Sequence, residues 1–130
     1  MKTIRVITAL DAVVATTTSN KFYVGGATRI GFLFRRADHS SGKTVFSVNI
    51  GGEAESTVTP TMTATNMLIP NVAGDNTKTL AHVASIDTGT ANGDFYAWLD
   101  PVCIATWVSV TATETTDGTH TAFIMCEYSD

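Results

Sequence analysis

The sequence predicts an all-β fold, an antiparallel β-sandwich of two sheets in a single domain that spans residues 1–130. The chain has 23 threonines, and their branched Cβ atoms suit a pleated strand better than a helix. Short segments alternate apolar and polar residues with a period of two, and turn signals separate them at spacings of about ten residues. No segment sustains a helical period, so two packed sheets follow, in a jelly-roll or an immunoglobulin-like order.

The first 20 residues are expected to form an N-terminal strand, over residues 3–9, and a connecting arm. The opening also has the basic start and apolar middle of a secretory signal, but Asp11 interrupts the apolar run. A strand is therefore the favoured interpretation. A second short strand is expected over residues 22–24, before Gly25 and Gly26.

Two central segments predict half-buried strands, each with three apolar residues on its inner face. These residues are Ile30, Phe32 and Phe34 in TRIGFLFRR, and Phe46, Val48 and Ile50 in KTVFSVNI. The polar loop DHSSGK lies between the two segments. This arrangement predicts a hairpin in which the two strands pair with each other.

Weaker strand signals follow. TMTATNMLIP is expected to supply a strand that ends at Pro70, and TLAHVASID alternates with both faces weakly apolar. FYAWLD places Phe95, Ala97 and Leu99 on one face, and Tyr96 and Trp98 on the other. Asp100 and Pro101 end that strand, so VCIAT is expected to be a turn of helix or an irregular crossing.

The segment WVSVTATETTDGTHTAFIMCEYS, residues 107–129, predicts a closing hairpin centred on Asp117 and Gly118. Its first arm should direct three residues at the core, namely Val108, Val110 and Ala112. The hairpin register would place Cys126 opposite Ser109, so Cys126 and Cys103 are expected to be free thiols.

The second arm of this hairpin is apolar on both faces. Phe123 and Met125 face one way and Ile124 faces the other, so one apolar row is left out of the core. Each large side chain left in water forgoes roughly 1.5 to 3 kcal/mol of burial. The sequence therefore predicts a cover for this row, either the N-terminal segment or another protein subunit.

Composition excludes several classes of partner. The formal net charge is -4 and the few basic residues are scattered, so neither nucleic acid nor a membrane surface is an expected partner. The apolar runs are too short to cross a bilayer. Charged residues make up 15% of the chain, against about 25% in typical soluble domains, and interface cores are similarly poor in charge.

No motif for catalysis or for a cofactor is recognisable, and the chain is not expected to be an enzyme. The three histidines lack metal-ligand spacing and are expected at the surface; they are His39, His82 and His120. Asp87, Asn92 and Asp94 in DTGTANGD form a weak candidate calcium site, although turn formation explains them better.

Aromatic residues offer a second class of function. Rings at Tyr23, Tyr96, Trp98, Trp107 and Tyr128 could stack on sugars in a carbohydrate-binding module. Packing in the core and at sheet edges is the favoured interpretation.

The chain resembles the small β-sandwich virion proteins of tailed phages and related viruses that decorate or cement capsids. The resemblance is carried by ALDAVVATTTSNKFYVGGATRIGFLFRR, KTVFSVNIGGE, FYAWLD and the closing WVSVTATETTDGTHTAFIMCEY. It implies a structural protein on the outer capsid surface, assembled in the host cytoplasm, that binds the major capsid protein and neighbouring copies, with a trimer as one arrangement. A tail or fibre component of a virion is the alternative.

The resemblance transfers no functional residue, because the class shares no active site. The pattern of the last segment suggests four contact residues instead. These are Trp107, Phe123, Met125 and Tyr128.

Overall fold

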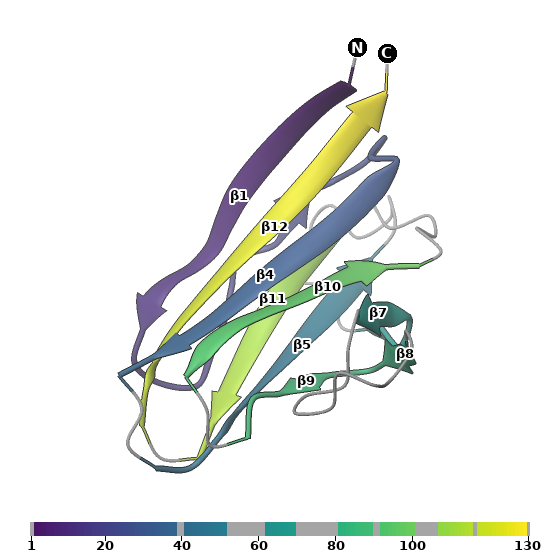
Figure 1. The fold of residues 1–130 in the computed structure, drawn as a ribbon. Coiled ribbons are helices and arrows are strands. Elements are labelled where there is room, and N and C mark those ends of the chain that lie inside the picture. Colours follow the sequence, from purple (N-terminus) through teal and green to yellow (C-terminus); the bar gives the residue numbers. More distant parts are fainter. Residues whose placement is uncertain are drawn as a thin grey trace.

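The computed structural model describes residues 2–38, 41–51, 62–69, 81–89, 92–100, 107–115 and 117–129. In these residues the chain forms two antiparallel sheets that pack face to face, as Figure 1 shows. The prediction of an all-β sandwich is confirmed. Within the described ranges no helix has the length and apolarity needed to cross a bilayer.

Sheet A has the strand order β1-β12-β4-β10-β7-β8, and sheet B has the order β2-β11-β5-β6, with β3 beside β11 and β9 beside β5. The strands of sheet A are β1 Lys2–Val13, β4 Arg29–Ala37, β7 Met67–Ile69, β8 Ala81–Val83, β10 Gly93–Leu99 and β12 Thr119–Ser129. The strands of sheet B are β2 Thr17–Thr18, β3 Phe22–Tyr23, β5 Thr44–Gly51, β6 Met62–Thr63, β9 Ile86–Asp87 and β11 Trp107–Glu114.

The connectivity is that of a jelly roll. The chain passes from β1 in sheet A to β2 and β3 in sheet B, and then alternates between the sheets through β4, β5, β10, β11 and β12. The long strands of this path, β4 and β5 and then β10, β11 and β12, therefore face each other across the core. The short strands β6 and β8 instead pair with the strands just before them, β5 and β7. This order decides between the two sandwich types that the sequence left open.

Both predicted hairpins are wrong for the same reason. β4 pairs with β12 and β10, whereas β5 pairs with β11, β6 and β9. β11 and β12 likewise lie in different sheets, and Ser109 is opposite Asn49 rather than Cys126. Alternation shows which residues of a strand point inward, but it does not show which strand lies beside it.

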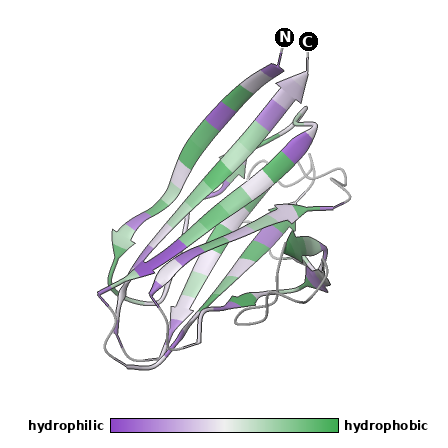
Figure 2. Ribbon diagram, viewed as in Figure 1, coloured by the Kyte–Doolittle hydropathy of each residue, from purple (hydrophilic) through white to green (hydrophobic). Residues whose placement is uncertain are grey.

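The inward residues of β4, β10 and β11 were predicted correctly. On β12 the register of the predicted hairpin set Phe123 and Met125 against the inward face of the first arm, whereas Ala122, Ile124 and Cys126 are the buried residues. Phe32, Phe34 and Phe46 are fully buried, and their rings stack, with centroids 5.7 Å apart for Phe32 and Phe34 and 4.8 Å apart for Phe34 and Phe46. The same core contains residues from both sheets, including Ile30, Val48, Ala97, Leu99, Val108, Val110, Ala112, Ala122 and Ile124. Figure 2 shows the apolar positions distributed along the strands of both sheets.

The N-terminal strand is longer than predicted. β1 pairs with β12 from Lys2 to Val13, and its register shifts after Thr8 and again after Leu10. Ala12, which lies in this irregular part, has a positive φ of 51°. The first half of β1, from Lys2 to Thr8, is regular.

Other elements differ from the prediction in detail. TMTATNMLIP contains two short strands, β6 and β7, and the segment after it divides into β8 in sheet A and β9 in sheet B. Cys126 is a buried free thiol, and burial raises its pKa. Cys103, the crossing VCIAT and His39 lie outside the described residues.

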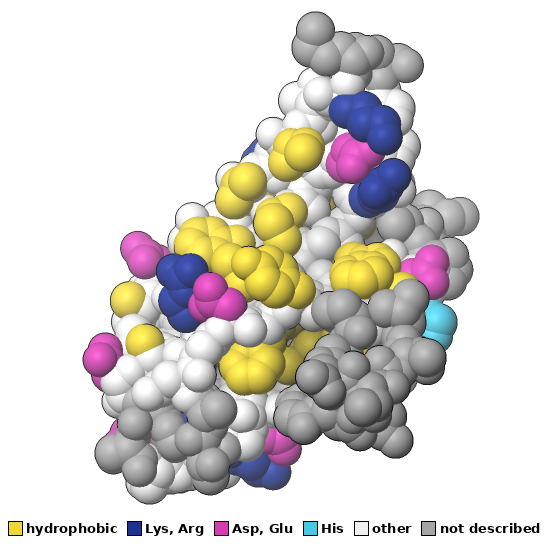
Figure 3. All heavy atoms as spheres, in the orientation of Figure 1, with side chains coloured by type: hydrophobic (Ala, Val, Ile, Leu, Met, Phe, Trp, Pro, Cys, Tyr) yellow, Lys and Arg dark blue, Asp and Glu magenta, His cyan; other side chains and the backbone are white. Residues whose placement is uncertain are grey.

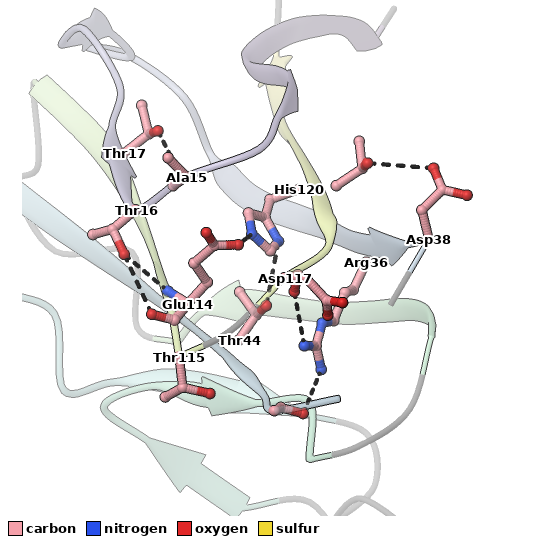
Figure 4. Close-up of polar contacts among 12 residues, drawn as sticks. Ala15, Thr16, Thr17, Arg36, Asp38, Thr44, Glu114, Thr115, Asp117 and His120 are labelled. Atoms are coloured by element: carbon pink, nitrogen blue, oxygen red, sulfur yellow. Dashed lines mark hydrogen bonds and ion pairs between the residues drawn. The ribbon is translucent and has the colours of Figure 1, made fainter. Parts of the chain in front are cut away.

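A buried polar corner joins the two sheets at the end of the sandwich away from the termini (Figures 1 and 4). Arg36, Thr44 and His120 are almost completely buried there. His120 Nε2 lies 2.7 Å from Glu114 Oε2, and Nδ1 lies 3.2 Å from Thr44 Oγ1. The expected surface position of His120 is therefore wrong, because its ring nitrogens find partners inside.

Arg36 links the connections by which the chain crosses between the sheets. Its two terminal nitrogens donate to five oxygen atoms at 2.8 to 3.2 Å, which belong to Ser41, Gly42, Thr88, Gly89 and Asp117. These acceptors come from the β4–β5, β9–β10 and β11–β12 connections. A planar guanidinium with several fixed donors can hold such a set, whereas an ammonium group cannot.

Candidate functional site

The outer face of sheet A carries an apolar patch. We define this outer patch by Ile4 and Val6 of β1, Leu33 of β4, Leu68 of β7, Tyr96 and Trp98 of β10, and Phe123 and Met125 of β12. Ile4, Val6 and Tyr96 are 66%, 61% and 52% exposed. Figure 3 shows apolar side chains gathered across this face. The second arm of the last segment therefore contributes its extra apolar row to a surface, not to the core.

The strand register builds the patch as two rows that cross the sheet. In the first row Val6 is opposite Met125, which is opposite Gly31, which is opposite Trp98, and Leu68 follows. Directly opposite residues in an antiparallel sheet point to the same face. These side chains therefore form one continuous surface.

In the second row Thr8 is opposite Phe123, which is opposite Leu33, which is opposite Tyr96. Phe123 and Leu33 are both partly exposed. With Leu68 of β7 in the first row, the patch thus extends over five neighbouring strands and is wider than the last strand alone indicates.

A hollow of about 900 Å³ opens at one end of the patch. It lies where β10 separates from β4, because the pairing of these strands ends at Trp98 and Gly31. Gly31 leaves space there, and a methyl group at its Cα would lie 3.6 Å from Met125 Cε. Polar groups of Arg29, Asp100 and Glu127 also line the hollow.

Ion pairs border the patch at two places. Glu127 lies 3.1 Å from Lys2 and 3.7 Å from Arg29. On the other side Arg35 contacts Asp94 through two hydrogen bonds of 2.8 and 3.2 Å. The hydrogen bond from Arg35 holds the pKa of Asp94 below its usual value. An apolar centre with a charged rim is the arrangement of many protein interfaces.

The outer face of sheet B is different in character. Its positions on β5 and β11 are mainly hydroxyl and amide side chains, namely Ser47, Asn49, Ser109, Thr111 and Thr113. Thr111 and Thr18 hydrogen-bond across the strands at 3.0 Å. The two faces of the sandwich therefore differ along their central strands, although Tyr23 of β3 and Met62 of β6 are exposed apolar side chains on sheet B.

The structure separates the four predicted contact residues. Phe123 and Met125 lie together in the outer patch, but Trp107 lies on sheet B, where its ring is 5.2 Å from that of Tyr23. Lys21 Nζ lies 4.7 Å from the Trp107 ring centroid. Tyr128 is partly buried and packs against the core. Their role as contact residues stays a prediction.

Sequence reasoning missed Ile4, Val6 and Leu33 as members of this surface. The alternation of TRIGFLFRR does place Leu33 on the outer side. The signal was incomplete because the patch becomes visible only when β1, β12, β4 and β10 are known to be neighbours.

The candidate calcium residues are engaged in other contacts. Asp87 accepts hydrogen bonds from Lys43 Nζ at 3.0 Å and from the Gly89 amide at 2.8 Å, and Asp94 binds Arg35. Among the described residues no group of three or more acidic, histidine or cysteine side chains could hold a metal ion. The calcium site stays a prediction.

The polar corner contains the arrangement carboxylate, imidazole and hydroxyl, in Glu114, His120 and Thr44. This order of groups is that of a nucleophilic triad. Thr44 and His120, however, have no exposed surface, so a substrate cannot reach the hydroxyl. The contacts serve to hold β5, β11 and β12 together.

Comparison with known proteins supports the fold. The SPBc2 prophage-derived protein YomS matches with a TM-score of 0.62 at 12% identity, over 98% of this chain and 95% of that one. The infectious bursal disease virus Gx strain structure matches at a TM-score of 0.39 and 11% identity, over 98% of this chain and 32% of that one. Of these two likenesses, the one to YomS is close enough to indicate a shared fold.

A disulfide-linked pilus of Bacillus endospores also matches, with a TM-score of 0.32 and 12% identity, over 99% of this chain and 85% of that one. No protein-family model matches the sequence, and no curated protein matches it.

Proposed function

We propose that this protein is a non-enzymatic structural component of a virus or phage particle, which decorates or cements the outer capsid surface by binding the major capsid protein and neighbouring copies of itself. The observation that carries the proposal is the outer patch of sheet A. Large exposed apolar patches with polar rims mark interaction sites on soluble proteins. In this proposal the protein joins the particle during assembly in the host cytoplasm.

Two further observations support this proposal. The protein YomS, which has a similar fold, is prophage-derived. The jelly-roll order of strands is also used by many viral capsid domains. A tail or fibre component of the same particle would use the outer patch in the same way, and it is the alternative for the location of the protein.

Binding to assembled shells tests the proposal directly. Shells of the major capsid protein from the same genome are mixed with the purified protein and sedimented. We expect co-sedimentation, and we expect Met125→Glu to weaken it at least about tenfold, because a charge would enter the apolar centre of the interface. Thr113→Glu is the matched control, since Thr113 is exposed on the opposite sheet.

An unchanged affinity of the Met125→Glu variant would show that the outer patch is not the binding surface. If the unmodified protein does not sediment with shells but binds isolated tails, the protein is a tail component. Failure with both would reject the virion role.

A carbohydrate-binding module is the second candidate, and one observation favours it. Trp98 lines the hollow beside polar groups of Asp100, Arg29 and Glu127, and Tyr96 is exposed on the same strand. Aromatic rings beside hydrogen-bonding groups suit sugar stacking. Retention on immobilised polysaccharides that Trp98→Ala abolishes would support this candidate over capsid binding.

A further inference from the structure

The two sheets have edges of very different lengths. In the described part of the chain, sheet B ends at β2 and β6 with two residues each, and sheet A ends at β8 with three residues on one side. Its other edge is β1, which has 12 residues. Figure 1 shows β1 along the outer side of the sandwich, with β12 on its inner side. Short edge strands avoid pairing with other chains, whereas a long edge invites it.

The regular half of this edge is suited to pairing. From Lys2 to Thr8, β1 follows β12 without a register shift, and the shifts begin only after Thr8. Natural edges are usually protected by such irregularities, by proline or by charged side chains. Residues 2–8 contain no proline, and of their two charged side chains, Lys2 and Arg5, Lys2 lies 3.1 Å from Glu127 of the same molecule. Ile4 and Val6 are among the most exposed apolar side chains, and they point to the outer face.

The charges of β1 favour a second copy of the same strand in antiparallel orientation. Lys2 and Arg5 lie in its first half, and Asp11 lies in its second half, all of them exposed. Antiparallel pairing of two copies brings the basic half of one strand toward the acidic end of the other. Parallel pairing would place like charges side by side, which destabilises a sheet.

The charges and the outer patch also restrict which residue lies on the two-fold axis. If Arg5 were on the axis, two guanidinium groups would lie directly opposite each other. If Val6 is on the axis, Val6 meets Val6, Ile4 meets Thr8 and Arg5 meets Ile7, so no like charges are opposed. This register also continues the outer patch from one molecule to the other, because Val6 forms its border.

We infer that two copies of this protein pair through β1, antiparallel and centred on Val6, so that the two A sheets become one continuous sheet. This inference rests on the proposed function, for which it names one contact between neighbouring copies. The interface is isologous, so each copy supplies the same strand.

Light scattering and cross-linking of the purified protein, without shells, test the inference. At about 100 μM we expect a mass twice that of the 13.8 kDa chain. Val6→Lys should give a monomer that remains folded, because Val6 is 61% exposed. The matched control is Val14→Lys, since Val14 is 71% exposed just beyond β1, and it should remain a dimer.

Cysteine variants then test which residues of the two β1 strands lie opposite each other. Directly opposite residues have Cβ atoms about 4.5 to 5.5 Å apart, close enough for a disulfide after a small adjustment. Under mild oxidation Val6→Cys alone should form a cross-linked dimer. Ile4→Cys and Thr8→Cys should cross-link only when mixed, and the unmodified chain controls for the natural thiols.

A monomer at this concentration, a cyclic trimer, or a dimer that survives Val6→Lys would overturn the inference. Efficient cross-linking of Ile4→Cys alone would overturn the register. These outcomes are independent of particle binding. A Val6→Lys monomer that still binds shells leaves the proposed function intact, and a dimer that binds neither shells nor tails rejects the function but not the pairing.

Discussion

Replacement of Arg36 by methionine should destabilise the protein strongly. The guanidinium is 1% exposed, and it donates to five oxygens in three connections between the sheets. Methionine fills a similar volume but donates no hydrogen bond. The carbonyl groups of Ser41, Gly42 and Asp117 then lose this donor, and the three connections are no longer linked.

The size of the effect follows from these contacts. A hydrogen bond to a charged group contributes about 1.5 to 3 kcal/mol, and such contributions are not additive. Thr88 Oγ1 keeps a second donor, the Thr44 amide, and Gly89 O keeps the Thr88 hydroxyl. The desolvation of the guanidinium, which also lowers the pKa of Arg36, offsets part of the gain. We therefore expect a net loss of about 3 to 5 kcal/mol.

Urea unfolding followed by tryptophan fluorescence measures this loss. With a slope near 2 kcal/mol per M, the midpoint should fall by roughly 1.5 to 2.5 M. Arg35→Met is the matched control. Arg35 is exposed and forms an ion pair with Asp94, so the urea midpoint of this variant should change little. An unchanged or higher midpoint for Arg36→Met would show that desolvation cancels the hydrogen bonds, and the polar corner would then not stabilise the fold.

Three further predictions concern the same structure. Gly118→Ala should lower the unfolding midpoint, because φ is 128° and a Cβ would lie 3.2 Å from Arg36 Nε; an unchanged midpoint would contradict the tight fit. Arg35 lowers the pKa of Asp94, so their ion pair stabilises the fold above the usual aspartate pKa, and this contribution is lost as the pH falls further. Asp94→Asn should therefore flatten the decline of the urea midpoint between about pH 5 and pH 3. The effect should be modest, because the pair is partly exposed. The buried thiol of Cys126, whose pKa is raised, should react with a thiol reagent only after denaturation, as a Cys103→Ser variant would reveal, and fast labelling of the native protein would refute its burial.

The sequence predicted the inward residues because they follow a strict alternation. Ile30, Phe32 and Phe34 face the core, as do Val108 and Val110. Neighbouring strands were not predictable in this way. In a jelly roll two consecutive long strands lie in opposite sheets, and each directs its apolar residues into the same core. Their sequences therefore alternate in the same way as those of the two strands of a hairpin. The paired partners are distant in sequence, as for β1 and β12.

The polar corner was hidden for a different reason. The alternation that buries Phe34 continues to Arg36, and the alternation that buries Ala122 also includes His120. Charge and polarity argue against burial unless partners exist. Here most of the partners of Arg36 are backbone carbonyls of three separate connections, and a sequence pattern gives no sign of them. The outer patch was predicted only in part, from Phe123 and Met125, because its other members depend on the strand order.

The pairing of β1 with β12 has a consequence for protein engineering. Lys2 lies opposite Ser129, so the two ends of the chain leave the sandwich at one corner (Figure 1). A short linker could join them into a ring, and the ring could be reopened at Gly25 and Gly26, which leaves the Arg36 contacts intact. Reopening at Gly42 would instead cut the β4–β5 connection, which supplies two of the five acceptors of Arg36. The difference in stability between the two circular permutants would therefore measure what this connection contributes to the fold.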